Sequence, residues 1–178
     1  MKIVQAPDSV LSSKAKPVEK IDKDIKKLLE DMEQTLLSAA DPEGVGIAAP
    51  QVGKSLQIFL MKPEKDSPVE AVINPVLELL GTPHKKKSKN GGALLEGCLS
   101  LKDIWGTVLR YPKVKITYLD AKGKSHTKTV TGWPARIIQH EYDHLQGILF
   151  PRRVLEQEGQ LYKSHKEDDK DVFEPLTI

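Results

Sequence analysis

The sequence predicts an α+β domain with antiparallel strands. An apolar stripe at helical spacing spans 21–36, and a second one spans 137–148. Between them, the segment 113–131 alternates apolar and polar residues on either side of the turn sequence AKGK, a pattern typical of a β-hairpin. One early helix, several strands and one late helix are the element order of an α+β fold.

The first helix is expected to be an amphipathic helix of about 18 residues. Its apolar residues recur every three or four positions: Ile21, Ile25, Leu28, Leu29, Met32 and Leu36. Asp22 and Asp24 can cap its start, and Asp41-Pro42 can end it. The stripe indicates core packing.

The middle of the chain is expected to consist of strands and loops. The glycine-rich run 44–53 has the composition of an irregular segment that passes close to another part of the molecule. Strands or extended stretches are expected at 55–61, 69–80, 93–101, 113–120 and 125–131. In the second of these, Asn74-Pro75 indicates a sheet edge or a bulge. The lysine-rich segment 84–89 is expected to be a solvated loop.

Composition points to one soluble domain in a reducing compartment. The chain has 178 residues, 39% of them hydrophobic and 29% charged, and no apolar run approaches the roughly 20 residues that span a bilayer. A net charge of +2 says little about partners, and no specific DNA binding is expected. The start MKIVQAPDSV resembles neither a secretory signal nor a transit peptide, and a single cysteine cannot form an internal disulfide, so a cytoplasmic location is expected.

The segment 139–147, QHEYDHLQG, places two histidines four residues apart. On a helix opened by Pro134 and ended by Gly147, they stack on one face about 6 Å apart along the axis. The face expected to be buried contains Ile137, His140, Glu141, His144, Leu145 and Ile148, and the face expected to be solvated contains Gln139, Tyr142, Asp143 and Gln146. Burying three polar side chains without partners would cost several kcal/mol each, and a metal ion would remove this conflict.

Two histidines leave a catalytic metal one protein ligand short. A metzincin protease would need a further histidine where this chain has Phe150, so that class is excluded. A zincin-like peptidase using Glu156 or Glu158 remains open, as does a structural metal module. Cys98 is the favoured third ligand, because one thiolate and two imidazoles leave a fourth position open.

Three segments together resemble the peptide deformylases: GVGIAAPQ at 44–51, EGCLS at 96–100 and QHEYDHLQG at 139–147. The resemblance extends to about Val154. It implies small antiparallel or mixed sheets packed around a central metal-binding helix, with the amphipathic helix before them. It also implies hydrolysis of the N-formyl group of the initiator methionine in nascent chains. The metal would usually be Fe(II), and Zn(II), Ni(II) or Co(II) could occupy the site.

The resemblance also implies roles for individual residues. Cys98, His140 and His144 would bind the metal, Glu141 would be the general base, and the Gln51 side chain and the Leu99 amide would stabilise the oxyanion. The Val45 carbonyl and Gly46 amide would pair with the substrate main chain. The substrate pocket would be lined by Val45, Gly97, Trp133, Ile137 and His140.

For other residues near these motifs, we expect a supporting or a solvent-exposed role. Glu96 and Arg110 match a supporting ion pair of the family. Arg136 is expected on the solvated face of the late helix. Trp133 is larger than the apolar residue of many relatives, which leaves the width of the pocket open. His84, His126 and His165 are expected to be solvated, without partners at ligand spacing.

The expected domain organisation is a catalytic domain over 1–154 followed by a polar tail over 155–178. Within the tail, KEDDKD at 166–171 is expected to be mobile. N-formylmethionyl nascent peptides are the expected substrates, and contact with the ribosome is expected to be transient. The tail lacks the basic helix with which some bacterial deformylases dock there, so the lysine-rich loop is the alternative contact.

Overall fold

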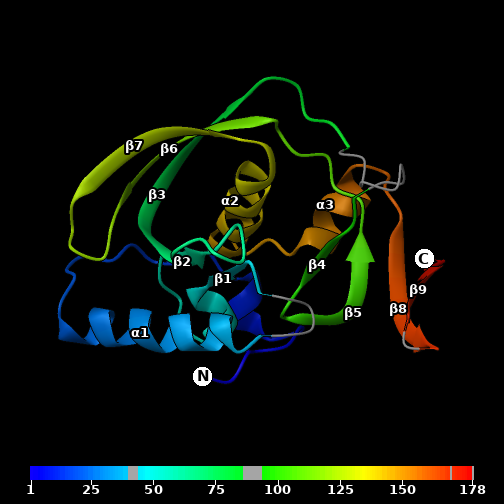
Figure 1. The fold of residues 1–178 in the computed structure, drawn as a ribbon, viewed down its shortest axis with the longest axis horizontal. Helices are drawn as coiled ribbons and strands as arrows, with labels where there is room; N and C mark the ends of the chain where they lie inside the picture. Colours follow the sequence, from blue (N-terminus) through cyan, green and yellow to red (C-terminus); the bar gives the residue numbers. More distant parts are fainter. Residues whose placement is uncertain (40–43, 86–93, 169, 178) are drawn as a thin grey trace.

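The computed structural model describes residues 1–39, 44–85, 94–168 and 170–177, and within them the α+β prediction is confirmed (Figure 1). A five-stranded antiparallel sheet contains, in spatial order, β1 (Gly46–Ala48), β2 (Ile58–Met61), β3 (Glu70–Leu80), β6 (Lys113–Leu119) and β7 (Ser125–Thr131). A four-stranded antiparallel sheet contains β4 (Glu96–Cys98), β5 (Leu101–Gly106), β8 (Leu161–Glu167) and β9 (Lys170–Pro175). The helices are α1 (Lys23–Leu37), α2 (Gly132–Leu145) and α3 (Phe150–Glu156), with short 3-10 turns η1 (Ser9–Ser12) and η2 (Ala49–Val52).

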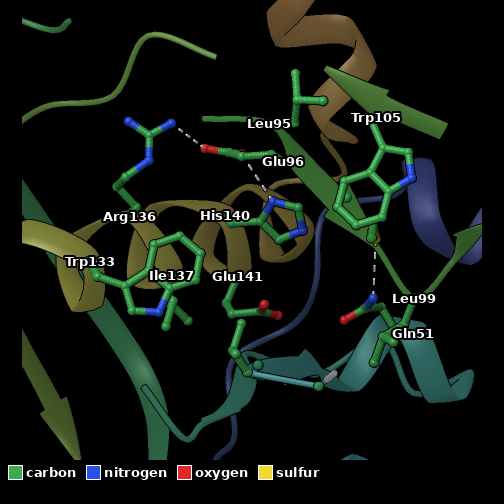
Figure 2. A pocket seen from close by; sticks show the side chains of 15 residues that line it. Gln51, Leu95, Glu96, Leu99, Trp105, Trp133, Arg136, Ile137, His140 and Glu141 are labelled. Carbon is green, nitrogen blue, oxygen red and sulfur yellow. Dashed lines mark hydrogen bonds and ion pairs between the residues drawn. The ribbon is translucent and has the colours of Figure 1, made fainter. Parts of the chain in front are cut away.

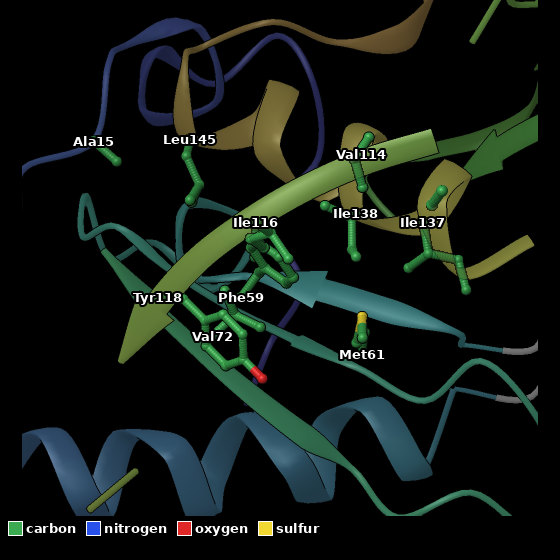
Figure 3. Packing of buried hydrophobic residues seen from close by; sticks show 12 residues of the cluster. Ala15, Phe59, Met61, Val72, Val114, Ile116, Tyr118, Ile137, Ile138 and Leu145 are labelled. Carbon is green, nitrogen blue, oxygen red and sulfur yellow. The ribbon is translucent and has the colours of Figure 1, made fainter. Parts of the chain in front are cut away.

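The two longer helices cover opposite faces of the five-stranded sheet. Along β2, Ile58 and Leu60 pack with α1, whereas Phe59 and Met61 pack with α2 (Figure 3). Successive side chains of a strand point to opposite faces, so a strand between two helices must be apolar throughout. All four residues of β2 are accordingly buried.

Two sequence features act as expected on local structure. Asp22 is the N-cap of α1, and its side chain accepts hydrogen bonds from the amides of Asp24 and Ile25, both at 3.0 Å. The Asn74-Pro75 interruption is a bulge, because the β3–β6 register shifts between Ile73 and Val76. Asn74 has a φ of 51°, and its side chain bonds to the backbone of Val18 through both amide atoms at 2.8 Å.

The expectation that the glycine-rich run is irregular is wrong. The glycine-rich run contains β1 and η2, because its small residues still allow three ladder positions against β2. The tail contains the β8–β9 hairpin, which was not expected, and the described residues of the segment 166–171 form its end, where Lys166 pairs with Asp171 and Glu167 with Lys170. The residues at Asp41-Pro42 and most of the lysine-rich loop lie outside the described residues. Among the described residues, no helix is long and apolar enough to span a membrane.

Candidate metal centre and active site

The site lies where the edge strands of the two sheets approach each other. β1 is an edge strand of the five-stranded sheet, and β4 is an edge strand of the four-stranded sheet. Both border a cavity of about 290 Å³, with α2 forming its base (Figure 2). The cavity is lined mainly by Gly44, Val45, Gly46, Gln51, Leu95, Glu96, Gly97, Cys98, Leu99, Trp105, Trp133, Arg136, Ile137, His140 and Glu141.

The structure brings Cys98, His140 and His144 together. One ligand atom from each lies within 4.8 Å of the other two. His140 and His144 are on successive turns of α2 with ring centroids 5.1 Å apart, and the Cys98 sulfur on β4 is 3.3 Å from Nε2 of His144. In a tetrahedral zinc site the sulfur and nitrogen ligands would be about 3.6 Å apart. The three side chains therefore fit a soft transition metal without rearrangement of the backbone.

Glu141 is the fourth polar group of this site. Its side chain is 3% exposed, and among the described residues its Oε2 has no hydrogen-bond partner. Burial raises the pKa of Glu141 to about 7, against the opposing charges of His140 and Arg110. A buried carboxylate without a protein partner is costly, which is expected where a metal and its water complete the site.

Gly46 is what allows Glu141 this position. A Cβ atom built on Gly46 would lie 2.4 Å from Oε1 of Glu141 and 2.7 Å from its Cδ. Real Cβ atoms do not approach so closely, so the carboxylate occupies the space that a side chain on β1 would take. The glycine of the first motif and the glutamate of the third are thus in direct contact.

The predicted ligand histidines have different surroundings. Nδ1 of His140 is 3.3 Å from Oε2 of Glu96, which leaves Nε2 to face the cavity. Burial lowers the pKa of His144 well below its usual value, so its imidazole is neutral, as a ligand must be. Burial also acts to lower the pKa of His140, but hydrogen bonds to Cys98 and Glu96 raise it well above its usual value, and a bound metal would displace that proton.

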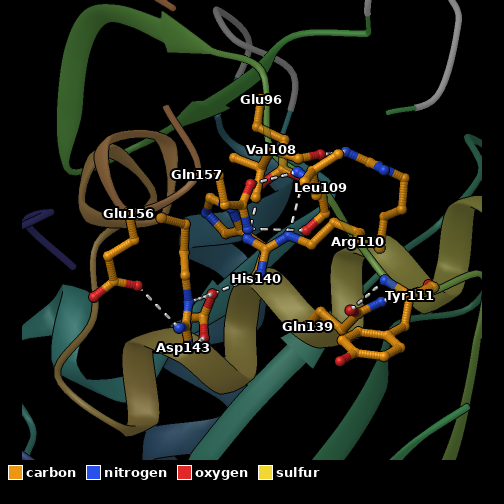
Figure 4. Close-up of polar contacts among 12 residues, drawn as sticks. Glu96, Val108, Leu109, Arg110, Tyr111, Gln139, His140, Asp143, Glu156 and Gln157 are labelled. Atoms are coloured by element: carbon orange, nitrogen blue, oxygen red, sulfur yellow. Dashed lines mark hydrogen bonds and ion pairs between the residues drawn. The ribbon is translucent and has the colours of Figure 1, made fainter. Parts of the chain in front are cut away.

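Glu96 connects the histidine to a buried ionic cluster (Figure 4). It accepts two hydrogen bonds from Arg110, at 2.9 and 3.1 Å, and one from Arg136 at 2.9 Å. Arg110 also donates to Asp143 at 2.6 Å, and Asp143 accepts from Arg153 at 2.8 Å. Burial disfavours the Glu96 carboxylate, but the charge of Arg110 and hydrogen bonds from His140 and Arg110 outweigh it and hold its pKa well below the usual range.

The prediction that one face of α2 is exposed to solvent is wrong. Arg136, Gln139 and Asp143 are at most 5% exposed, while Tyr142 and Gln146 are partly buried. The reason is that α2 packs on both sides. The five-stranded sheet covers the apolar stripe of the helix. The segment after β5 covers the opposite side, where Gln139 bonds to the Tyr111 backbone through both amide atoms.

The main-chain groups of Val45 and Gly46, both predicted to contact the substrate, point to opposite sides of β1. The Val45 carbonyl accepts a hydrogen bond from the Lys62 amide at 2.8 Å and is therefore used within the sheet. Ladder partners alternate along an antiparallel pair, so both backbone polar groups of Gly46 point to the free edge. The Val45 carbonyl therefore faces β2 and the main-chain groups of Gly46 face the free edge, and pairing of either residue with a substrate main chain stays a prediction.

The predicted oxyanion residues lie at the same end of the cavity as Cys98. Gln51, on η2, is 1% exposed; its Oε1 accepts from the Ala48 amide at 2.8 Å, and its Nε2 is 3.4 Å from the Cys98 sulfur. This fixed amide presents its donor to the centre of the site. Leu99 follows Cys98 directly and also lines the cavity.

The cavity has two unlike ends. Trp133 and Ile137 form one end and Trp105 forms the other, with His140 and Glu141 between them in the view of Figure 2. Val45 packs in the same apolar cluster as Trp133 and Ile137. Sequence reasoning missed Trp105, because β5 was not expected. It also misplaced Arg136, although positions 136, 140 and 143 fall at i, i+4 and i+7 and share one side of the helix.

The remaining candidates lie apart from the cluster. Glu156 is exposed and accepts hydrogen bonds from Arg152 and Arg153, and Glu158 is exposed. His126 is not merely solvated, since it contacts Asp120 at 2.7 Å and stacks on Tyr118. None of these is in the three-residue ligand group found among the described residues.

Comparisons with known proteins agree with this geometry. The sequence model of the family described as Polypeptide deformylase matches residues 1–160. A peptide deformylase of Symbiobacterium thermophilum is 38% identical over 177 residues, which are 99% of this chain and 76% of that protein. The crystal structure of peptide deformylase from Thermotoga maritima aligns with a TM-score of 0.74 at 36% identity, covering 85% of this chain and 95% of that one.

A second solved structure, a peptide deformylase from Synechococcus elongatus in complex with actinonin, has a TM-score of 0.74 at 35% identity and covers 85% of this chain and 76% of that one. The resemblance carried by the three sequence motifs is therefore confirmed at the level of the whole domain. The chain belongs to the polypeptide deformylase family.

Proposed function

We propose that this deformylase hydrolyses the N-formyl group of N-terminal formyl-methionine in new polypeptides and releases formate, with Glu141 as the general base. The observation that carries the proposal is the buried Oε2 of Glu141, which has no partner in the described part of the chain, beside the ligand group of Cys98, His140 and His144. A structural metal would need a fourth protein ligand and no such carboxylate. A zincin-like peptidase is not favoured, because Glu156 is exposed and paired with arginines.

The proposed metal is Fe(II) in the cell, with Zn(II), Ni(II) or Co(II) able to occupy the same three ligands. When bound, the ion supplies a Lewis acid at the centre of the cavity. The ionic cluster around Glu96 supports the ligand set, because Glu96 fixes the ring of His140 from the far side.

The remaining steps belong to side chains of this protein. Glu141 takes a proton from the attacking water as its oxygen bonds to the formyl carbon, and then gives that proton to the amine as the C–N bond breaks. Negative charge develops on the formyl oxygen. The Nε2–H of Gln51 and the Leu99 amide are the proposed donors to it, and loss of one such donor typically costs about 3 kcal/mol of barrier.

The two edge strands explain how a broad class of substrates could be bound. A peptide lying between β1 and β4 can pair with the free main chain of Gly46 as an added strand. Its first side chain would enter the end formed by Val45, Trp133 and Ile137, with His140 beside it. Such pairing is independent of later side chains and suits nascent chains, which this enzyme is proposed to meet in the cytoplasm during a transient contact with the ribosome.

The test is formate release from formyl-Met-Ala-Ser by protein loaded anaerobically with Fe(II). Glu141→Gln should keep the metal and lose at least about 100-fold in kcat, the usual contribution of a general base. Glu156→Gln is the matched control and should keep both metal and activity, whereas a zincin-like site using Glu156 would lose them. Full activity of Glu141→Gln would remove Glu141 from the mechanism.

A further inference from the structure

The β8–β9 hairpin extends the sheet that carries Cys98. β5 pairs with β8, placing Trp105 opposite Tyr162, and β8 pairs with β9, placing Ser164 opposite Phe173 (Figure 1). The hairpin begins at Leu161, after residue 160, where the family match ends.

The hairpin holds the Trp105 ring through one residue from each of its strands. The indole Nε1–H donates a hydrogen bond to Oγ of Ser164 at 2.9 Å. The ring of Phe173 meets the indole edge-to-face, with centroids 5.6 Å apart and planes at 90°. A half-buried tryptophan with its N–H satisfied and a ring packed against it has little rotational freedom.

The six-membered ring of the same indole covers the backbone of β4. A Cβ built on Gly97 would lie 2.7 Å from one atom of the ring and 2.9 Å from the next. Trp105 and Gly97 both line the cavity, and Trp105 lies at the end away from Trp133 (Figure 2). Gly97 precedes Cys98 directly, so the indole lies beside the strand that carries the thiolate ligand.

We propose that the C-terminal hairpin is part of the substrate-binding apparatus, because through Ser164 and Phe173 it positions Trp105 as the wall for substrate residues that follow the formyl-methionine. This inference rests on the proposed function. A peptide whose first side chain fills the Trp133 end and whose formyl carbon reaches Glu141 must continue between β1 and β4. Trp105 is the ring that borders β4 there. Its fixed orientation removes an entropic cost of binding, which favours affinity for any following residues.

Two substrates of different length separate this role from general stability. Formyl-Met-Ala-Ser reaches past the first residue, and formyl-methioninamide does not. Ser164→Ala should raise KM for the tripeptide about threefold, with kcat unchanged and with no change in KM for formyl-methioninamide. Ser164→Thr keeps a hydroxyl acceptor and should restore the wild-type KM. Lys163→Ala, an exposed neighbour on the opposite face of β8, is the control and should behave as wild type.

A double-mutant cycle tests whether Ser164 acts through the indole. Trp105→Phe removes the N–H donor, and in that background Ser164→Ala should cause no further change. Phe173→Ala provides an independent variant of the other contact and should also raise KM for the tripeptide alone, by about threefold to tenfold. Melting temperatures identify any variant that fails to fold, in which case Phe173→Ala and Ser164→Thr carry the test.

The outcomes of the two proposals are distinguishable. If the metal-loaded wild type releases formate from neither substrate, the proposed function itself is wrong. If the wild type is active but the hairpin variants leave KM for the tripeptide unchanged, or change both substrates equally, then the hairpin does not position the cleft wall. An additive effect of Ser164→Ala and Trp105→Phe would likewise overturn the inference.

Discussion

Replacing Gly46 by alanine should separate the fold from the chemistry. Gly46 is in an ordinary extended conformation, so alanine itself adds no backbone strain. The new Cβ would lie 2.4, 2.7 and 2.9 Å from three atoms of the Glu141 side chain, all closer than real Cβ contacts. Either the carboxylate or β1 must move by about 1 Å, and Glu141 is buried with little room to yield. A displacement of that size costs about 100-fold in rate where a catalytic group is misplaced.

The same clash should reduce stability by about 1–3 kcal/mol, the usual cost of overpacking a core, which corresponds to a fall in melting temperature of about 2–12 °C for a chain of this size. Formate release from formyl-Met-Ala-Ser, bound metal and thermal unfolding are the three measurements. Metal content should remain unchanged, because Cys98, His140 and His144 are not displaced. Glu141→Ala is the control background, in which Gly46→Ala should cost no further stability. Wild-type kcat and melting temperature for Gly46→Ala would refute the contact between β1 and the general base.

Three further perturbations test other parts of the structure. Arg110→Met should destabilise by about 3 kcal/mol in chemical denaturation, because it leaves two buried carboxylates short of a partner; a change below about 0.5 kcal/mol would contradict the cluster. Asn74→Ala should cost about 2 kcal/mol, since it removes two bonds to Val18 at a positive φ, and Asn74→Gly should cost less if strain contributes. Hydrogen bonds from His126 and from the Lys124 and Lys122 amides lower the pKa of Asp120 to about 2. The stabilising effect of the Asp120 carboxylate should therefore be present above pH 3.8 and lost as pH falls through about 2. In His126→Ala, the pKa of Asp120 measured by NMR titration of its carboxyl group should return toward 3.8.

The spacing of apolar residues correctly predicted the helices and strands that pack against the core on one side only. The stripe of α1 and the alternation of β6 and β7 each face a single apolar layer, so sequence period and burial agree. The same reasoning failed on α2, where polar residues were assigned to solvent. Arg136 and Asp143 are buried because a second layer supplies Glu96, Arg110 and the Val108 carbonyl as partners. The spacing of positions 136, 140 and 143 places them on one side of the helix, but nothing local to the helix reveals the groups that pack there.

The two strands of the tail were not predicted, for a related reason. Strands β8 and β9 are mostly exposed and polar, so composition alone suggested a polar, partly mobile tail. Their order comes from pairing with β5, a strand distant in sequence, and from ring packing on Trp105. Edge pairing of this kind depends on backbone hydrogen bonds that any side chain can accompany, and polarity is then a poor guide to disorder.

The cleft is built from walls with different supports. β1 is fixed by the apolar core between α2 and the five-stranded sheet, where Ala48 packs with Phe59 and Met61. β4 is tied to α2 largely through ions, because Glu96 on β4 bonds to side chains on the helix and to Arg110. Ion pairs fix direction as well as distance, since each carboxylate oxygen has its own donor. The metal site needs that directional support, because two of its ligands are on the helix and the third is on the strand facing it.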